Sequence, residues 1–96
     1  MMTLEEIRSI LSAHKEQLRN RFGVKEIGIF GSSARGDTGD VSDIDLLVDF
    51  ERPIGLAFTE LAEYLENILG TNVDVVSKNA IKPRFLQSVE EDLIHV

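Results

Sequence analysis

The 96-residue sequence has no cysteine, no tryptophan and only two prolines. Without cysteine there can be no disulfide framework, no thiolate metal site and no thiol nucleophile, which leaves the compartment open but favours the cytosol by default. No apolar run approaches the ~20 residues that cross a bilayer, and the N-terminus has no signal-peptide pattern. We therefore expect neither secretion nor a membrane anchor.

Basic residues are scarce relative to acidic ones. Ten Lys and Arg stand against 17 Asp and Glu, which gives a net charge of −7 and a pI near 4.7. Affinity for a phosphate backbone needs clustered Lys and Arg, so this balance argues against direct binding of nucleic acid. A basic protein partner, or solubility alone, explains the acidic composition better.

The length suits one domain, residues 1–96, with a single modest core and no room for a separate substrate-binding domain. Hydrophobic periodicity predicts an opening amphipathic helix over residues 3–22, with a capping box formed by Thr3 and Glu6. Further elements are predicted as strands at 24–30, 45–50 and 73–76, a short helix from about 32 that stops before 36, and helices at about 56–69 and 83–92. The pattern predicts an α/β (α+β) fold, a small mixed β-sheet packed with helices, with the site at one edge of the sheet.

The chemistry is concentrated in GIFGSSARGDTGDVSDIDLLVD, residues 28–49. A strand breaks at Gly31 and Ser32, and a small-residue turn that leads into a helix offers backbone N–H groups to an anion. Asp43 and Asp45 open the next strand, where alternation places both carboxylates on one face. Carboxylates this close repel unless a proton or a cation lies between them, and Mg²⁺ prefers such oxygen ligands. The combination indicates metal-assisted phosphoryl chemistry.

Each part also has an ordinary explanation, because a Gly-Ser turn is often only a turn and Asp-x-Asp is often a cap. Their order is more specific. GSSARG (31–36) followed by SDIDLLVDF (42–50) resembles the nucleotidyltransferase superfamily related to DNA polymerase beta. Within it, the chain is similar over nearly its whole length to the minimal nucleotidyltransferases, the MntA-like antitoxins of HEPN toxins, which share a GS, ten-residue gap, D-x-D signature.

The resemblance implies a polymerase-beta-like fold in which Gly31 and Ser32 bind the nucleotide. It implies that Asp43 and Asp45 bind two Mg²⁺ ions, and that a third carboxylate on a later strand joins them. Asp74 is the matching residue. The implied activity is transfer of AMP from ATP to a tyrosine hydroxyl of a HEPN toxin, which silences the toxin within a hetero-oligomer.

The positions of Asp74 and Asp49 in their strands also bear on their roles. Asp74 lies between apolar neighbours, and a charge inside a short buried strand is costly unless paired, which favours a metal or catalytic role. Asp49 shares a strand face with Asp45, but four residues at a rise of ~3.3 Å place it too far away to share a metal.

Five basic or imidazole side chains are each open to more than one interpretation. Arg35 could contact phosphate, or form an ion pair that holds the loop. Lys78, Lys82 and Arg84 could offset triphosphate charge, or be ordinary surface bases. His14 lies on the apolar stripe of the first helix, and we expect a hydrogen-bonded core or boundary residue outside the site.

Two other classes of function remain open. The chain could be a non-catalytic antitoxin that acts by binding its toxin, although the intact Gly-Ser turn and the three candidate carboxylates favour an enzyme. It could also modify a small molecule, as related antibiotic nucleotidyltransferases do, but those carry an additional domain. The preference for ATP rests on the resemblance alone.

Overall fold

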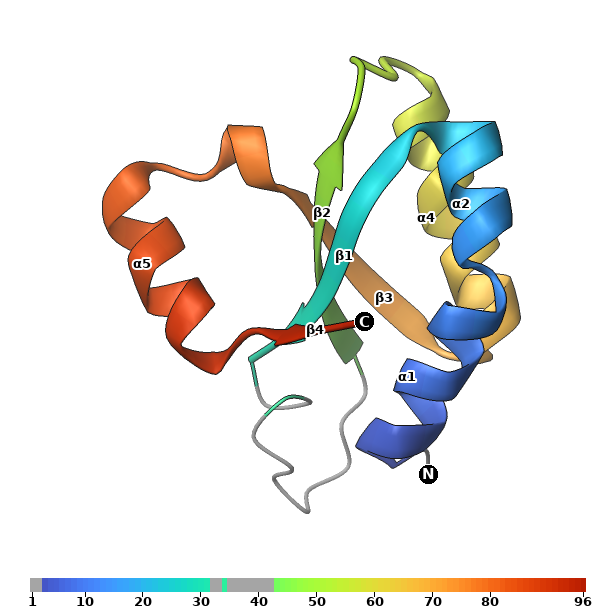
Figure 1. Ribbon diagram of the computed structural model, residues 1–96, viewed down its shortest axis with the longest axis horizontal. Helices are drawn as coiled ribbons and strands as arrows, with labels where there is room; N and C mark the ends of the chain where they lie inside the picture. The colour runs from blue at the N-terminus through green and yellow to red at the C-terminus, as the bar shows by residue number, and fades with distance from the viewer. Residues whose placement is uncertain (1–2, 32–33, 35–42) are drawn as a thin grey trace.

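The computed structural model describes residues 3–31, 34 and 43–96. The elements are, in chain order, α1 (Leu4–Ala13), α2 (Lys15–Phe22), β1 (Val24–Phe30), β2 (Asp43–Phe50), α4 (Ala57–Leu69), β3 (Asn72–Ser77), the 3-10 turn η1 (Lys78–Ala80), α5 (Pro83–Asp92) and β4 (Ile94–His95). Helices and one mixed sheet form the fold, as the sequence predicts (Figure 1). Within the described ranges, no helix has both the length and the apolar character needed to cross a membrane.

The sheet has four strands in the order β3-β2-β1-β4. β1 is antiparallel to both β2 and β4, whereas β2 and β3 are parallel. A parallel pair needs a crossover connection, and α4 supplies it. Figure 1 shows α1, α2 and α4 on one side of the sheet and α5 on the other.

The hydrophobic core lies between the sheet and the three helices α1, α2 and α4. Alternate strand residues point into it, including Ile29 of β1 and Leu46 of β2, both with no exposed surface. The helices contribute Leu11, Leu18, Phe22, Leu61, Leu65 and Leu69. Leu47 faces the other side of the sheet and is still only 5% exposed. The run of residues 46–48 is therefore buried on both faces, as predicted.

The prediction of one continuous helix over residues 3–22 is wrong, because the chain leaves helical geometry at His14. Its Nδ1 donates to the Ile10 carbonyl at 2.9 Å, so the ring takes the acceptor that a helical N–H would use. The His14 backbone N–H donates instead to the Leu11 carbonyl at 3.1 Å. The ring also packs edge-on against Tyr64, with centroids 5.9 Å apart. His14 is thus the hydrogen-bonded boundary residue that we expected.

The remaining elements differ from prediction mainly at their ends. β1 and α5 have the predicted bounds, while β2 begins two residues earlier and β3 extends one residue further at each end. The capping box at the start of α1 is present, since Thr3 Oγ1 accepts the Glu6 N–H at 3.1 Å. Neither η1 nor β4 was predicted. Only residue 34 of the short helix predicted after Gly31 is described, and the rest lies outside the described residues.

Candidate active site

Three strand ends meet at one end of the sheet. β1 ends at Phe30 there, and β2 and β3 begin there, because β2 runs antiparallel to β1 and parallel to β3. In the register of these strands, Asp45 lies between Phe30 on one side and Asp74 on the other. The fold therefore places two aspartates that are 29 positions apart in sequence on neighbouring strands.

The candidate carboxylates share the sheet face opposite the core. Ile44 and Leu46 of β2 point into the core, so the intervening Asp45 points to the other face, as does Asp43. On β3 the same alternation places Asp74 on that face, because Val73 belongs to the core. This face is the one on which α5 lies (Figure 1).

Gly31 brings the turn after β1 directly against Asp45. The glycine has a φ of +72°, which L side chains rarely adopt. A Cβ atom at this position would overlap Asp45 Oδ2 and would lie 3.3 Å from Asp45 Cγ. The Ala34 N–H donates to the Gly31 carbonyl at 3.1 Å. Ser32 and Arg35, the other predicted nucleotide-binding residues, lie outside the described residues.

The expected burial of Asp74 is wrong. β3 is the terminal strand of the sheet, and Asp74 is exposed although its neighbour Val73 is buried. Solvation of the carboxylate removes the cost on which the burial argument depended. The position of Asp74 beside half-buried Asp45 is now what recommends it as a site residue.

The donor atoms suit a hard cation such as Mg²⁺, because all three candidates are carboxylates on one face. Asp43 and Asp45 are two residues apart, or about 7 Å along the strand. Within residues 3–31, 34 and 43–96, no three His, Asp or Glu side chains are already gathered closely enough to hold a metal ion. Asp43 and Asp74 are exposed, and exposed side chains change rotamer readily. Their chemistry and placement fit a metal that draws the carboxylates together.

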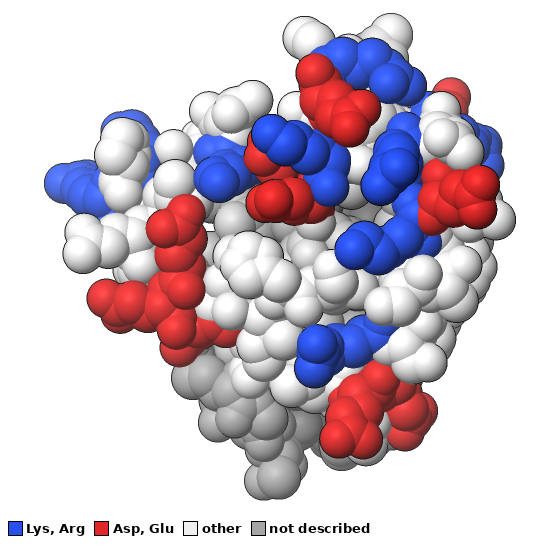
Figure 2. Space-filling model, in the orientation of Figure 1, with Lys and Arg blue, Asp and Glu red and all other residues white. Residues whose placement is uncertain are grey.

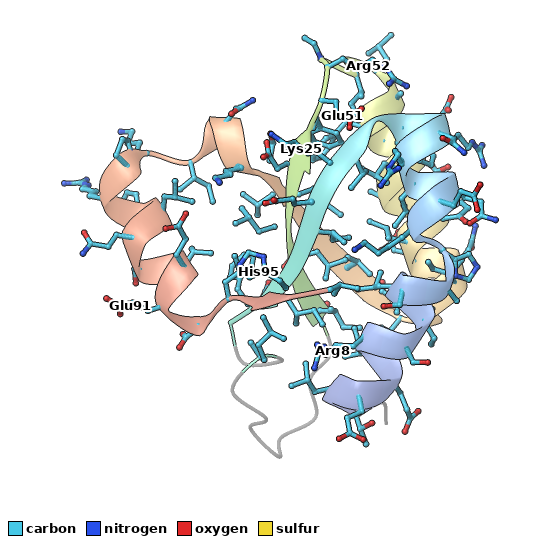
Figure 3. The ribbon with its side chains drawn as sticks, viewed as in Figure 1. Arg8, Lys25, Glu51, Arg52, Glu91 and His95 are labelled. Carbon is cyan, nitrogen blue, oxygen red and sulfur yellow. The ribbon has the colours of Figure 1, made fainter. Side chains whose placement is uncertain are left out.

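The basic residues after β3 lie away from this end of the sheet. Because β2 and β3 are parallel, Ser77 pairs with Val48, and Lys78 follows beyond it. Lys78 lines a cavity of about 370 Å³ together with Asp49 and His95, and Figure 3 shows His95 on the α5 side of β1. Lys82 and Arg84 lie at the start of α5, which Figure 1 shows away from the end of the sheet where β2 and β3 begin.

Charge is unevenly distributed over the face shown in Figure 2. Lys and Arg side chains gather over α2 and β1, with Asp and Glu side chains among them, whereas only acidic side chains gather along the C-terminal half of α5. The net charge of −7 therefore does not describe each surface of the molecule.

Sequence reasoning missed the contact between the end of the chain and β1. A Cβ on Gly28 would lie 3.0 Å from Leu93 Cγ and 3.2 Å from the Ile94 carbonyl oxygen. A glycine inside a predicted strand signals such a close approach. The sequence shows the glycine, but it does not show that residues 93 and 94 are the ones that approach it.

The chain is similar to known proteins over nearly its whole length. Residues 11–96 match the family described as the nucleotidyltransferase domain. The chain is 54% identical over 97 residues to the protein adenylyltransferase MntA of Thermococcus cleftensis, covering 100% of this chain and 98% of the relative. A solved minimal nucleotidyltransferase superposes with a TM-score of 0.81 at 38% identity, covering 97% of this chain and 95% of the other. A toxin–antitoxin crystal structure with AMP-PNP superposes with a TM-score of 0.70 at 25% identity, covering 98% and 72%.

Proposed function

The chain belongs to the minimal nucleotidyltransferases and is an MntA-like protein adenylyltransferase, and we infer its reaction from this family. Such an enzyme takes AMP from ATP. We propose that the acceptor is a tyrosine hydroxyl of a HEPN-domain toxin, that the transfer depends on Mg²⁺, and that it silences the toxin. The name of the relative and the structural neighbour solved as a toxin–antitoxin with AMP-PNP support this assignment.

The observation that carries the proposal is the contact between the Gly31 turn and the Asp45 carboxylate. A phosphate-binding turn and a cation-binding carboxylate can act on the same phosphate only if they are adjacent. An ordinary turn and an ordinary strand cap have no need of this contact. The neighbouring position of Asp74 adds a third carboxylate on the same face.

The residues would divide the work as follows. The turn at Gly31 and Ser32 would hold the triphosphate, and Asp43 and Asp45 would hold two Mg²⁺ ions. When bound, the ions neutralise phosphate charge and polarise the α-phosphorus. Asp74 would complete the metal shell and accept the proton of the attacking hydroxyl.

The bond changes follow from this arrangement. The acceptor oxygen forms a bond to the α-phosphorus while the bond from that phosphorus to the bridging oxygen of the β-phosphate breaks. AMP stays on the acceptor, pyrophosphate leaves, and the hydroxyl proton passes to Asp74. The chain contributes position and charge rather than a covalent intermediate.

The test is intact-mass spectrometry of the cognate HEPN-domain protein after incubation with this chain, ATP and Mg²⁺. We expect the mass of one or more AMP units to be added. The Asp43→Asn, Asp45→Asn double variant should abolish the addition while remaining folded. A stable complex without any mass addition by the unmodified chain would show instead an antitoxin that acts by binding. AMP transfer to small alcohols in the absence of protein would identify a small-molecule enzyme.

A further inference from the structure

The outer edge of β3 is available for pairing with another strand. β3 ends the sheet, and no other described segment pairs with its outer side. The Val73 N–H donates to the Glu66 carboxylate at 3.3 Å, so Glu66 occupies this edge at the start of the strand. Backbone N–H and C=O groups point to alternate sides along a strand. Those of Val75 and Ser77 therefore point to the outer edge, as the Val73 N–H does. Such an edge is a template for an added strand.

An apolar cleft lies along the C-terminal half of β3, which contains Val75 and Ser77. Its volume is about 640 Å³, and its walls come from the end of β2, the segment that follows, the start of α4, and β3 with η1. The lining is mostly apolar, with Glu51 and Arg52 as its charged members, and its apolar residues include Phe50, Ile54, Phe58, Val75, Val76 and Ala80. Leu56, next to the lining segment, is 95% exposed. A strand edge beside an apolar cleft suits an extended polypeptide that carries an apolar side chain.

The edge leads directly to the candidate active site, because Asp74 immediately precedes Val75. Neighbouring strands lie about 4.8 Å apart, and residues directly opposite each other point to the same face. A residue opposite Asp74 on an added strand would therefore place its side chain beside the Asp74 carboxylate. The exposure of Asp74 leaves room for that side chain.

We propose that the acceptor protein presents its hydroxyl on an extended segment that pairs with the outer edge of β3. The hydroxyl-bearing residue lies opposite Asp74, and an apolar residue about two or three positions away occupies the cleft, given the ~3.3 Å rise of a strand. Backbone pairing orders the segment, and the cleft sets its register. This inference rests on the proposed function, because it assigns the acceptor segment of the same reaction.

The first test changes the cleft without touching the aspartates. Ala80 lines the cleft and is exposed, so Ala80→Arg places a long side chain in the cleft, and a second cation beside Arg52, with little risk to the fold. Ser88→Arg, at an exposed position on α5 outside the cleft, adds the same side chain as a control. With the HEPN-domain protein as acceptor, we expect Ala80→Arg to lower kcat/KM for the acceptor at least ~10-fold and to leave the KM for ATP within about twofold. Ser88→Arg should match the unmodified chain.

The second test does not depend on catalysis. Hydrogen exchange of the amides in residues 73–80 is measured with and without the HEPN-domain protein. We expect slower exchange in β3 when the partner is bound, and weaker binding of the partner by Ala80→Arg than by Ser88→Arg. Unchanged exchange in β3, or equal behaviour of the two arginine variants, overturns the proposal.

The two proposals fail in different ways. If AMP is transferred but Ala80→Arg behaves as the control, the acceptor binds elsewhere and the proposed function stands. If the edge of β3 becomes protected and Ala80→Arg weakens binding, but no AMP is transferred, then the docking surface stands and the proposed function fails.

Discussion

A comparison of Gly31→Ala with Gly70→Ala separates the cost of backbone strain from the effect of damage to the candidate active site. Gly31 and Gly70 have almost the same left-handed φ, +72° and +70°. An alanine in this region costs roughly 1–2 kcal/mol. A Cβ on Gly70 would meet no atom within 4 Å, whereas a Cβ on Gly31 would overlap the Asp45 carboxylate. The pair therefore shares the conformational cost, and only Gly31→Ala displaces a candidate catalytic group.

The expected effects can be separated by two assays. Thermal unfolding followed by circular dichroism should show that the Tm of each variant falls by roughly 4–8 °C for each kcal/mol of unfolding free energy that the alanine costs. Single-turnover AMP transfer at a temperature where both variants are folded should be about 10²-fold slower in Gly31→Ala, because a displacement of about 1 Å at a reacting group can cost that much. Gly70→Ala should transfer at the unmodified rate. Equal transfer rates for the two variants would refute the argued contact between turn and carboxylate.

Two further predictions concern the parts of the sheet that flank the site. Gly28→Ala should cost about 1–3 kcal/mol and speed amide exchange in residues 93–96, because the added methyl group meets Leu93 and the Ile94 carbonyl; unchanged exchange there would contradict this packing. Glu66→Ala should lower the free energy of unfolding by about 0.5–1.5 kcal/mol, because the Val73 N–H loses its acceptor at a sheet edge where water can replace it. Glu66→Gln retains a side-chain oxygen and should lose less in the same urea titration, and equal losses would show that this hydrogen bond contributes little.

The fold was predictable where its determinants are local. The seven residues of β1 form an apolar-rich run that ends at a glycine turn, and the ten of α5 combine helical spacing with a proline in the first turn. β4 has only two residues and no periodicity, and it exists because Ile94 and His95 pair with Ile29 and Gly28 across the chain. The break at His14 escaped prediction for a different reason. It depends on one ring reaching one carbonyl, which the apolar spacing does not record.

The candidate site was predictable in its members and less so in its geometry. The motif singled out Gly31, Asp43 and Asp45, but only the fold reveals the contact between Gly31 and Asp45. Asp74 was proposed partly for a wrong reason, because a sequence does not tell which strand will lie at the end of a sheet. Asp74 lies beside Asp45 because of the parallel register of β2 and β3, and no local sequence pattern determines that register.

The most direct measurement compares three aspartates on one sheet face. Asp45→Asn, Asp74→Asn and Asp49→Asn make the same chemical change, and Asp49 lies on the same face of β2 as Asp45 but about 13 Å further along. In single-turnover AMP transfer to the HEPN-domain protein, we expect the first two variants to lose at least ~10²-fold and Asp49→Asn to stay within about twofold of the unmodified chain. An Asp45→Asn variant that transfers AMP as fast as Asp49→Asn would contradict the assignment of the active site.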